Sequence, residues 1–121
     1  MIKENLRRFG AMLVEVVRGD MPGALEDLPT PDRIFIGGGL GTDEETAEHI
    51  LDIASGALKH GGKLVLHCIL LETLLRAKRY VEAKGWNFGI TQIQASTSDR
   101  LAGDLRFQAQ NPVFILWAEK P

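Results

Sequence analysis

The sequence predicts an α/β fold whose sheet is mostly parallel and ends in an antiparallel pair of strands. Strand-like runs alternate with helical stretches along most of the chain, which is typical of parallel sheets. Residues Lys63 to Leu70 are almost continuously apolar, as in a strand covered on both faces, so we expect a doubly wound sheet. Trp86 to Ala95 and Val113 to Ala118 read as strands with no helical pattern between them, which predicts antiparallel pairing.

The first part of the chain predicts a helix, a strand and a helical turn. Residues 2–9 have a helical pattern that ends at Gly10, a residue suited to the left-handed cap. Met12 to Arg18 is rich in β-branched residues, which favours a strand that ends before Gly19 and Asp20. A short helical turn should then hold Pro22, Ala24, Leu25 and Leu28. The following Pro29 to Pro31 segment predicts an extended turn.

The middle of the chain predicts a strand from Arg33 to Ile36 that runs directly into the glycine-rich loop Gly37 to Gly41. Thr42 and Glu45 have the spacing of a capping box, so a helix should begin there. Its apolar positions follow the helical period: Ala47, Ile50, Leu51, Ala54 and Leu58. After the strand that begins at Lys63, a second helix should run from about Leu71 to Ala83.

Composition limits the class of protein. A chain of 121 residues with 45% hydrophobic content should form one domain over residues 1–121. The 14 basic and 16 acidic residues give a net charge of -2, which provides no general attraction to nucleic acid or to a membrane surface. The single cysteine, Cys68, lies in an apolar run and can form no disulfide within the chain. We therefore expect a cytoplasmic protein.

The glycine-rich loop has two interpretations, a phosphate-binding nucleotide loop or a loop that faces a substrate. A dinucleotide loop needs an acidic residue at the tip of the next strand, roughly 20 residues on, to hold the ribose. The next strand here ends at His67 and Cys68, and the first acid beyond it, Glu72, falls in the predicted helix. The nucleotide interpretation therefore lacks the acidic residue that would hold the ribose.

Ligands of open α/β sheets bind at the carboxyl ends of the strands, and three strand ends carry polar or flexible residues. These are Asp20, the Gly37 to Gly41 loop, and His67 with Glu72 and Thr73. Each has a plainer alternative. Asp20 could cap the helical turn, His67 could be a core histidine, and Glu72 and Thr73 could serve only the first turn of their helix.

A series of short motifs in this order resembles a known family. The motifs are Asn5–Gly10, Gly19–Pro22, Leu28–Asp32, Ile34–Gly38, Gly61–Gly62, Leu71–Thr73 and Asn111–Val113. Together they resemble the C-terminal part of the precorrin-6Y C5,15-methyltransferases (decarboxylating) and of the cobalt-precorrin C15-methyltransferases. The resemblance spans essentially the whole chain.

The resemblance implies an incomplete class I, Rossmann-like methyltransferase domain of cobalamin biosynthesis that uses S-adenosylmethionine and a tetrapyrrole. It implies methylation at C15 and removal of the acetate carboxyl at C12. The implied cofactor residues are Gly19, Asp20, Met21, Gly37 and Gly38. The implied substrate residues are Gly39, Leu40, His67, Glu72 and Thr73. It assigns no catalytic side chain and no metal ligand.

Two departures from the family pattern stand out. The family usually has asparagine and threonine where this chain has His67 and Leu70. The family also places a glycine-rich cofactor loop and two βα units, on the order of 60 residues, before the helix matched by residues 2–9. We therefore expect this chain alone to bind S-adenosylmethionine weakly or not at all, and its open sheet edges to favour a homo-oligomer. The alternatives are a non-catalytic interaction module and a methyltransferase for another substrate.

Overall fold

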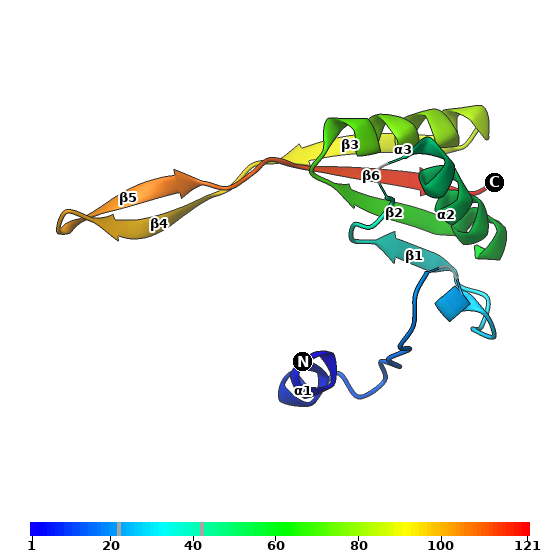
Figure 1. The fold of residues 1–121 in the computed structure, drawn as a ribbon, viewed down its shortest axis with the longest axis horizontal. Helices are drawn as coiled ribbons and strands as arrows, with labels where there is room; N and C mark the ends of the chain where they lie inside the picture. Colours follow the sequence, from blue (N-terminus) through cyan, green and yellow to red (C-terminus); the bar gives the residue numbers. More distant parts are fainter. Residues whose placement is uncertain (22, 42) are drawn as a thin grey trace.

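A four-stranded sheet organises the fold of the computed structural model, which describes residues 1–21, 23–41 and 43–121. Its order is β1 (Arg33–Ile36), β2 (Lys63–Cys68), β6 (Val113–Glu119) and β3 (Asn87–Ile93). The β1 and β2 strands are parallel, whereas β6 is antiparallel to both β2 and β3. Three strands therefore share one direction (Figure 1). The predicted α/β class and the antiparallel pairing of β3 with β6 are confirmed.

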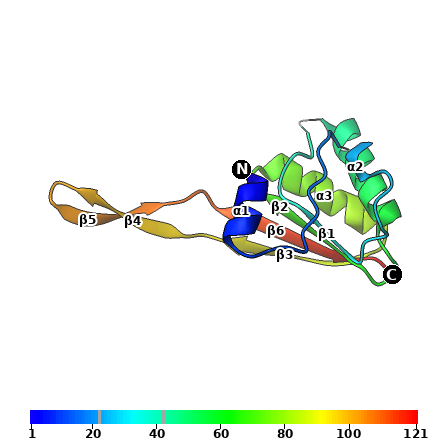
Figure 2. The ribbon, with the colours of Figure 1, turned by 90° about the horizontal axis from the view of Figure 1, so that it is seen from below.

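Two helices pack side by side on one face of this sheet (Figure 2). These are α2 (Glu44–Ala57) and α3 (Leu71–Ala83), both close to their predicted bounds. Alternate strand residues point into the core beneath them: Leu64, Leu66, Cys68, Leu116 and Ala118. The helices contribute buried residues that include Leu51, Ala54, Ala77 and Val81. Burial of these apolar side chains is the main stabilising term of the fold.

The opposite face of the sheet is much less covered. Val65 and His67 alternate with the buried residues of β2 and are only half-buried, and Phe35 on β1 is 67% exposed. The expectation that β2 is covered on both faces is therefore wrong within the described residues, because α2 and α3 lie on the same face. Trp117 provides part of the cover here, since a Cβ on Gly89 would lie 2.6 Å from its indole nitrogen.

The N-terminal segment lies beyond the β1 edge of the sheet (Figure 1). Helix α1 (Ile2–Arg8) and the left-handed Gly10, with φ of 70°, match the prediction. The predicted strand Met12 to Arg18 does not form, because no other strand within residues 1–21, 23–41 and 43–121 supplies hydrogen-bond partners for it. The helical turn is present as the 3-10 helix η1 (Gly23–Leu25). Pro22 lies outside the described residues.

Two helix starts differ in detail from the expectation. Strand β2 ends at Cys68 rather than Leu70, because Leu70 is already the N-cap of α3. At α2 the N-cap is Asp43, whose carboxylate accepts a hydrogen bond from the backbone N–H of Thr46 at 2.8 Å. This hydrogen bond lowers the pKa of Asp43. Thr42, the other half of the predicted capping box, lies outside the described residues.

A long hairpin projects from the sheet and is absent from the expectations. It consists of β4 (Ser96–Leu101) and β5 (Asp104–Ala109), which continue the line of β3 and β6 away from the body (Figures 1 and 2). We call this hairpin the arm. Its turn residues Ala102 and Gly103 have φ of 53° and 78°, the conformation of a tight two-residue hairpin turn.

The residue after β6 ties the sheet to the end of α2. Lys120 donates hydrogen bonds from its ammonium group to the backbone carbonyls of Ser55 at 2.6 Å and Leu58 at 2.7 Å. Its own carbonyl accepts from the Gly61 N–H at 2.6 Å. These contacts satisfy carbonyl groups at a helix end, which have no partner within the helix.

Candidate functional site

A pocket of about 390 Å³ opens at the carboxyl ends of β1 and β2. Its volume falls in the range of roughly 300–1,000 Å³ found for small-molecule sites. The lining residues come from the loop after β1, the end of β2 and the start of α3: Gly37, Gly38, Gly39, Leu40, Gly41, His67, Cys68, Ile69, Leu70 and Thr73. This is the edge at which open α/β sheets bind ligands.

The glycine loop presents bare backbone to this pocket. Gly38 and Gly39 have φ of 145° and 79°, and a Cβ added to either would meet no heavy atom within 4 Å. A ligand can therefore approach the main chain closely at both residues. The loop is anchored by Leu40, which is only 3% exposed, and by Gly41, whose added Cβ would lie 2.8 Å from the Thr46 methyl carbon.

The side chains of the pocket are mostly apolar. His67 and Thr73 are half-buried and are its main polar side chains, together with the thiol of Cys68. Burial raises the pKa of Cys68, so the thiol stays neutral near pH 7. No carboxylate is among the lining residues. Such a pocket can exclude water and hold an apolar or planar group, and the imidazole ring of His67 can donate or accept a hydrogen bond there.

Six of the predicted site residues come together here: Gly37, Gly38, Gly39, Leu40, His67 and Thr73. Met21 instead lines a separate apolar cavity of about 530 Å³ beside β1. Gly19 and Asp20 are exposed in the segment before η1, and the Asp20 carbonyl accepts a hydrogen bond from the Ala24 N–H at 2.9 Å. Glu72 is exposed at the start of α3 and does not line the pocket.

Sequence reasoning did not assign Cys68 and Ile69 to the site and named Leu70 only as a departure from the family pattern, although all three line the pocket. Their signal was the apolar run from Lys63 to Leu70, which we interpreted only as strand and core. The strand ends at Cys68, so Ile69 and Leu70 lie beyond it and line the pocket together with the glycine loop.

The pocket fits only part of an S-adenosylmethionine molecule. Exposed backbone at Gly38 and the apolar wall suit the methionine portion with its methyl group. A carboxylate that could hold the ribose hydroxyls is missing from the lining. Within residues 1–21, 23–41 and 43–121, no group of three His, Cys, Asp or Glu side chains is placed to hold a metal ion.

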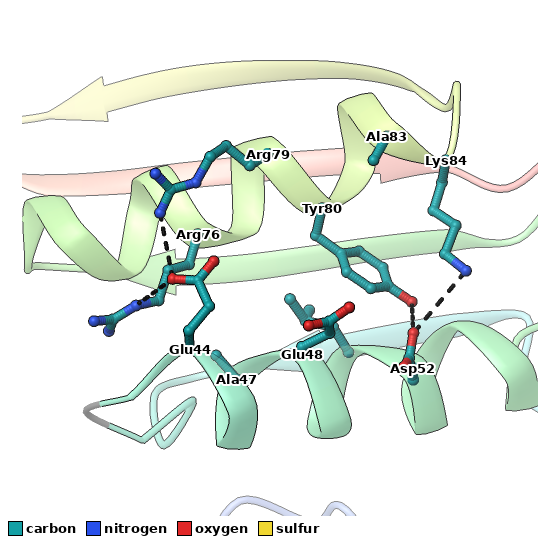
Figure 3. A pocket seen from close by; sticks show the side chains of 10 residues that line it. Glu44, Ala47, Glu48, Asp52, Arg76, Arg79, Tyr80, Ala83 and Lys84 are labelled. Atoms are coloured by element: carbon teal, nitrogen blue, oxygen red, sulfur yellow. Dashed lines mark hydrogen bonds and ion pairs between the residues drawn. The ribbon is translucent and has the colours of Figure 1, made fainter.

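A second groove of about 480 Å³ lies between α2 and α3, on their side facing away from the sheet (Figure 3). Glu44 bridges Arg76 at 3.3 Å and Arg79 at 3.4 Å. At the other end the Tyr80 hydroxyl donates to the Asp52 carboxylate at 2.6 Å. Burial, and then this hydrogen bond, raises the pKa of Tyr80 to about 12. Apart from Glu48, the charged side chains that line this groove form ion pairs with one another, so we interpret the groove as the contact between the two helices.

Comparison with known proteins agrees with this architecture. A sequence model described as precorrin methyltransferase domain matches residues 1–120. A probable cobalt-precorrin-6B C(15)-methyltransferase (decarboxylating) from Sulfurisphaera tokodaii is 31% identical over 120 residues, which are 98% of this chain and 60% of that relative. The chain thus spans about 60% of the length of this relative.

Solved structures give the same result. The crystal structure of precorrin-6Y C5,15-methyltransferase from Geobacter metallireducens GS-15 is 35% identical in sequence and has a TM-score of 0.84. The match covers 98% of this chain and 61% of that protein. A SAM-dependent O-methyltransferase from Thermotoga maritima is 14% identical and has a TM-score of 0.62, and the match covers 98% of this chain and 44% of that protein. This similarity shows a shared fold only. Given the match over residues 1–120, the chain belongs to the precorrin methyltransferase domain family.

Proposed function

We propose that this chain is the C-terminal part of a methyltransferase domain that transfers a methyl group from S-adenosylmethionine to a tetrapyrrole carbon in cobalamin biosynthesis, with decarboxylation of an acetate side chain. The main observation behind the proposal is the family match over residues 1–120. The pocket at the carboxyl ends of β1 and β2 is a second observation, made from the structure and independent of that match. The chain spans about 60% of its relative, so this activity belongs to the intact protein.

The residues of this chain act by position rather than by acid–base chemistry. Exposed backbone at Gly37 and Gly38 lies beside the methionine portion of the cofactor, and Gly19, Asp20 and Met21 border the adenine. Gly39, Leu40, His67 and Thr73, which line the pocket, face the macrocycle, and Glu72 approaches it from outside the pocket at the exposed start of α3. S-adenosylmethionine supplies the electrophilic methyl group when bound. Holding that methyl in line with a ring carbon and excluding water accounts for much of the rate of such a transfer.

The proposed function also predicts how weakly the isolated 121-residue chain binds S-adenosylmethionine. The pocket lacks the carboxylate that would hold the ribose, so we expect calorimetric titration of the 121-residue chain with S-adenosylmethionine to show no binding in the micromolar range. Micromolar binding would contradict the proposal that the cofactor site is shared with upstream residues. The proposal includes a cytoplasmic location, supported by the single buried Cys68, and a homo-oligomer, supported by the open β1 and β3 edges. No helix in the described ranges is long and apolar enough to cross a membrane.

The decisive experiment uses the intact reading frame, purified and supplied with S-adenosylmethionine and a precorrin. Mass spectrometry should show a product that has gained one methyl group and lost carbon dioxide. The variant His67→Asn should alter substrate turnover because His67 lines the pocket, whereas His49→Asn, an exposed position on α2, should leave turnover unchanged. An intact protein that folds but methylates no precorrin while accepting other substrates would favour a methyltransferase of different specificity. Absence of any methyl transfer would favour a non-catalytic module.

A further inference from the structure

Two large apolar side chains line the candidate pocket and are still open to solvent. Ile69 and Leu70 follow the end of β2, and they are 56% and 62% exposed. We call these two residues the Ile69–Leu70 wall. Apolar side chains that gather at the mouth of a pocket mark a surface that a ligand covers. A substrate bound in the pocket would therefore exclude water from the space beside this wall.

The pocket offers no opposite charge to an acidic group. Among the described residues that line it there is no lysine, arginine, aspartate or glutamate. The two helices that begin beside the pocket carry acids in their first turns, Glu44 and Glu45 on α2 and Glu72 on α3. These carboxylates offset the positive ends of the two helix dipoles. A substrate carboxylate at the wall would therefore lose water without gaining a counter-ion from these side chains.

The first basic residue of α3 is also held away from the pocket. Arg76 lies one turn after Thr73, which lines the pocket, but the Arg76 side chain is only 17% exposed. Its Nε donates to the Glu44 carboxylate at 3.3 Å, and Arg79 reaches the same carboxylate at 3.4 Å. Both arginines line the groove between α2 and α3 (Figure 3). Their charge is thus already paired on the other side of the helix start.

We propose that the Ile69–Leu70 wall is where the acetate carboxylate of the tetrapyrrole is placed for its loss as carbon dioxide. This inference rests on the proposed function and adds to it the residues that promote decarboxylation. Two observations support it together: the wall is apolar and open to a ligand, and the side chains around it supply no cation.

The chemistry of the step explains why such a wall helps. The bond between the acetate methylene carbon and the carboxylate carbon breaks, and its electron pair passes into the conjugated ring. Carbon dioxide leaves, and the methylene carbon takes a proton from water to become a methyl group. The charge of the carboxylate disappears in this step, so water or a cation beside the carboxylate stabilises the ground state and slows the reaction. Ile69 and Leu70 act by keeping both away.

The test compares two adjacent leucines in the intact protein, supplied with S-adenosylmethionine and a precorrin. Leu70 lines the pocket, whereas Leu71 is equally exposed at 62% and does not line it. Leu70→Lys places an ammonium group at the wall, and Leu71→Lys places the same charge one residue later. Mass spectrometry then counts the methylated products that have lost carbon dioxide and those that have kept it.

The two variants should differ in decarboxylation per methyl group transferred. In Leu70→Lys this ratio should fall about tenfold or more, because a nearby opposite charge favours the ionised carboxylate by roughly one to three pKa units. In Leu71→Lys it should change by less than about threefold, as for an exposed charge. Ile69→Lys, on the same wall, should behave like Leu70→Lys and serves as the test if Leu70→Lys does not fold.

Binding gives a readout that needs no turnover. In a fluorescence titration with the precorrin alone, Leu70→Lys should bind about threefold or more tightly than Leu71→Lys, because its ammonium group pairs with the carboxylate before the reaction. Tighter binding with slower decarboxylation distinguishes this role from a loss of structure, which would weaken binding.

The outcomes separate this inference from the proposed function. Equal decarboxylation ratios in Leu70→Lys and Leu71→Lys, or weaker precorrin binding in a folded Leu70→Lys, would overturn the inference while the unmodified protein still methylates the precorrin. An unmodified protein that transfers no methyl group would overturn the proposed function, and the inference with it.

Discussion

Two stretches of similar composition, Met12–Arg18 and Lys63–Cys68, have opposite outcomes in this structure. Both are rich in Val and Leu, and both read as strands. Lys63–Cys68 forms β2 between β1 and β6 and is covered by two helices. Met12–Arg18 has no strand beside it among the residues that the structure describes, and it forms none. The difference shows that β-propensity describes how well a side chain fits a half-buried pleated surface, and that a neighbour must supply that surface.

Proline substitution should produce the largest contrast between the two stretches. Val65→Pro removes a backbone donor from a central strand and should prevent folding, at a cost of about 3 kcal/mol or more. Val17→Pro, in the unpaired stretch, should change the free energy of unfolding by less than about 0.5 kcal/mol. Urea denaturation followed by tryptophan fluorescence measures both. A large loss of stability in Val17→Pro would mean that Met12–Arg18 is paired in solution.

Truncating one side chain in each stretch should again lower the free energy of unfolding unequally, with a smaller difference than for proline. Leu64 on β2 is fully buried, so Leu64→Ala should lower the free energy of unfolding by about 2–5 kcal/mol. Leu13 is fully exposed, so Leu13→Ala should cost less than about 0.5 kcal/mol. The same urea titration applies. Equal losses at the two positions would show that the N-terminal segment packs on a surface of its own.

A hydrogen bond from the Tyr80 hydroxyl joins the two helices that cover β2, and its contribution to the free energy of unfolding depends on pH. Tyr80 bonds Asp52 across α2 and α3, and Tyr80→Phe should cost about 1 kcal/mol at neutral pH, because the site is only half-buried. The pKa of Tyr80 is raised to about 12 from 10.0, so the folded state holds its proton more tightly than the unfolded state. The stabilisation is therefore complete below pH 10 and is lost as the pH rises towards 12.

This prediction can be read directly, because Tyr80 is the only tyrosine of the chain. The tyrosinate absorbance of the folded protein should appear with a midpoint near 12 rather than near 10.0. Asp52→Asn keeps the size of the side chain and removes its charge, so it should lower the midpoint. A midpoint near 10.0 in the unmodified chain would contradict the contact between the two helices.

The smallest expected effect is that of a glycine substitution in α2, one of the two helices that cover β2. Gly56 lies exposed within α2, and a Cβ there meets no heavy atom within 4 Å. Gly56→Ala should therefore stabilise the protein by about 0.5–1 kcal/mol. Gly41→Ala should have the opposite sign, since Gly41 has φ of 74° and its Cβ would press on Thr46. Hydrogen exchange should show slower opening of β2 in Gly56→Ala and no change in Met12–Arg18.

Much of the fold can be predicted from the sequence where local pattern and long-range partners agree. The period of Ala47, Ile50, Leu51 and Ala54 gave α2, and the missing helical pattern before Val113 gave the antiparallel pairing of β3 with β6. The arm was missed because Ser96–Leu101 and Asp104–Ala109 are polar on one face and lack an apolar core to face. The strand at Met12–Arg18 was predicted wrongly because a local pattern does not report whether a neighbour exists.

The site was predictable to the extent that strand topology alone determines it. The carboxyl ends of β1 and β2 had to lie side by side, so the glycine loop, His67 and Thr73 were placed together correctly as neighbours. Whether they bind cofactor and substrate stays a prediction. Asp20 and Glu72 fall outside the pocket, because their positions depend on how the flanking segments leave the sheet rather than on the strands themselves.

The position of β6 has a consequence for synthesis. It is the last strand of the sheet along the chain, yet it lies between β2 and β3 and pairs with both. While a ribosome is still making the arm, β2 and β3 each have one edge whose partner in the fold, β6, has not yet been made. The sheet can close only when residues 113–119 have emerged, and Lys120 then ties the end of α2. The nascent chain is therefore exposed to misassociation until β6 is available to pair with β2 and β3.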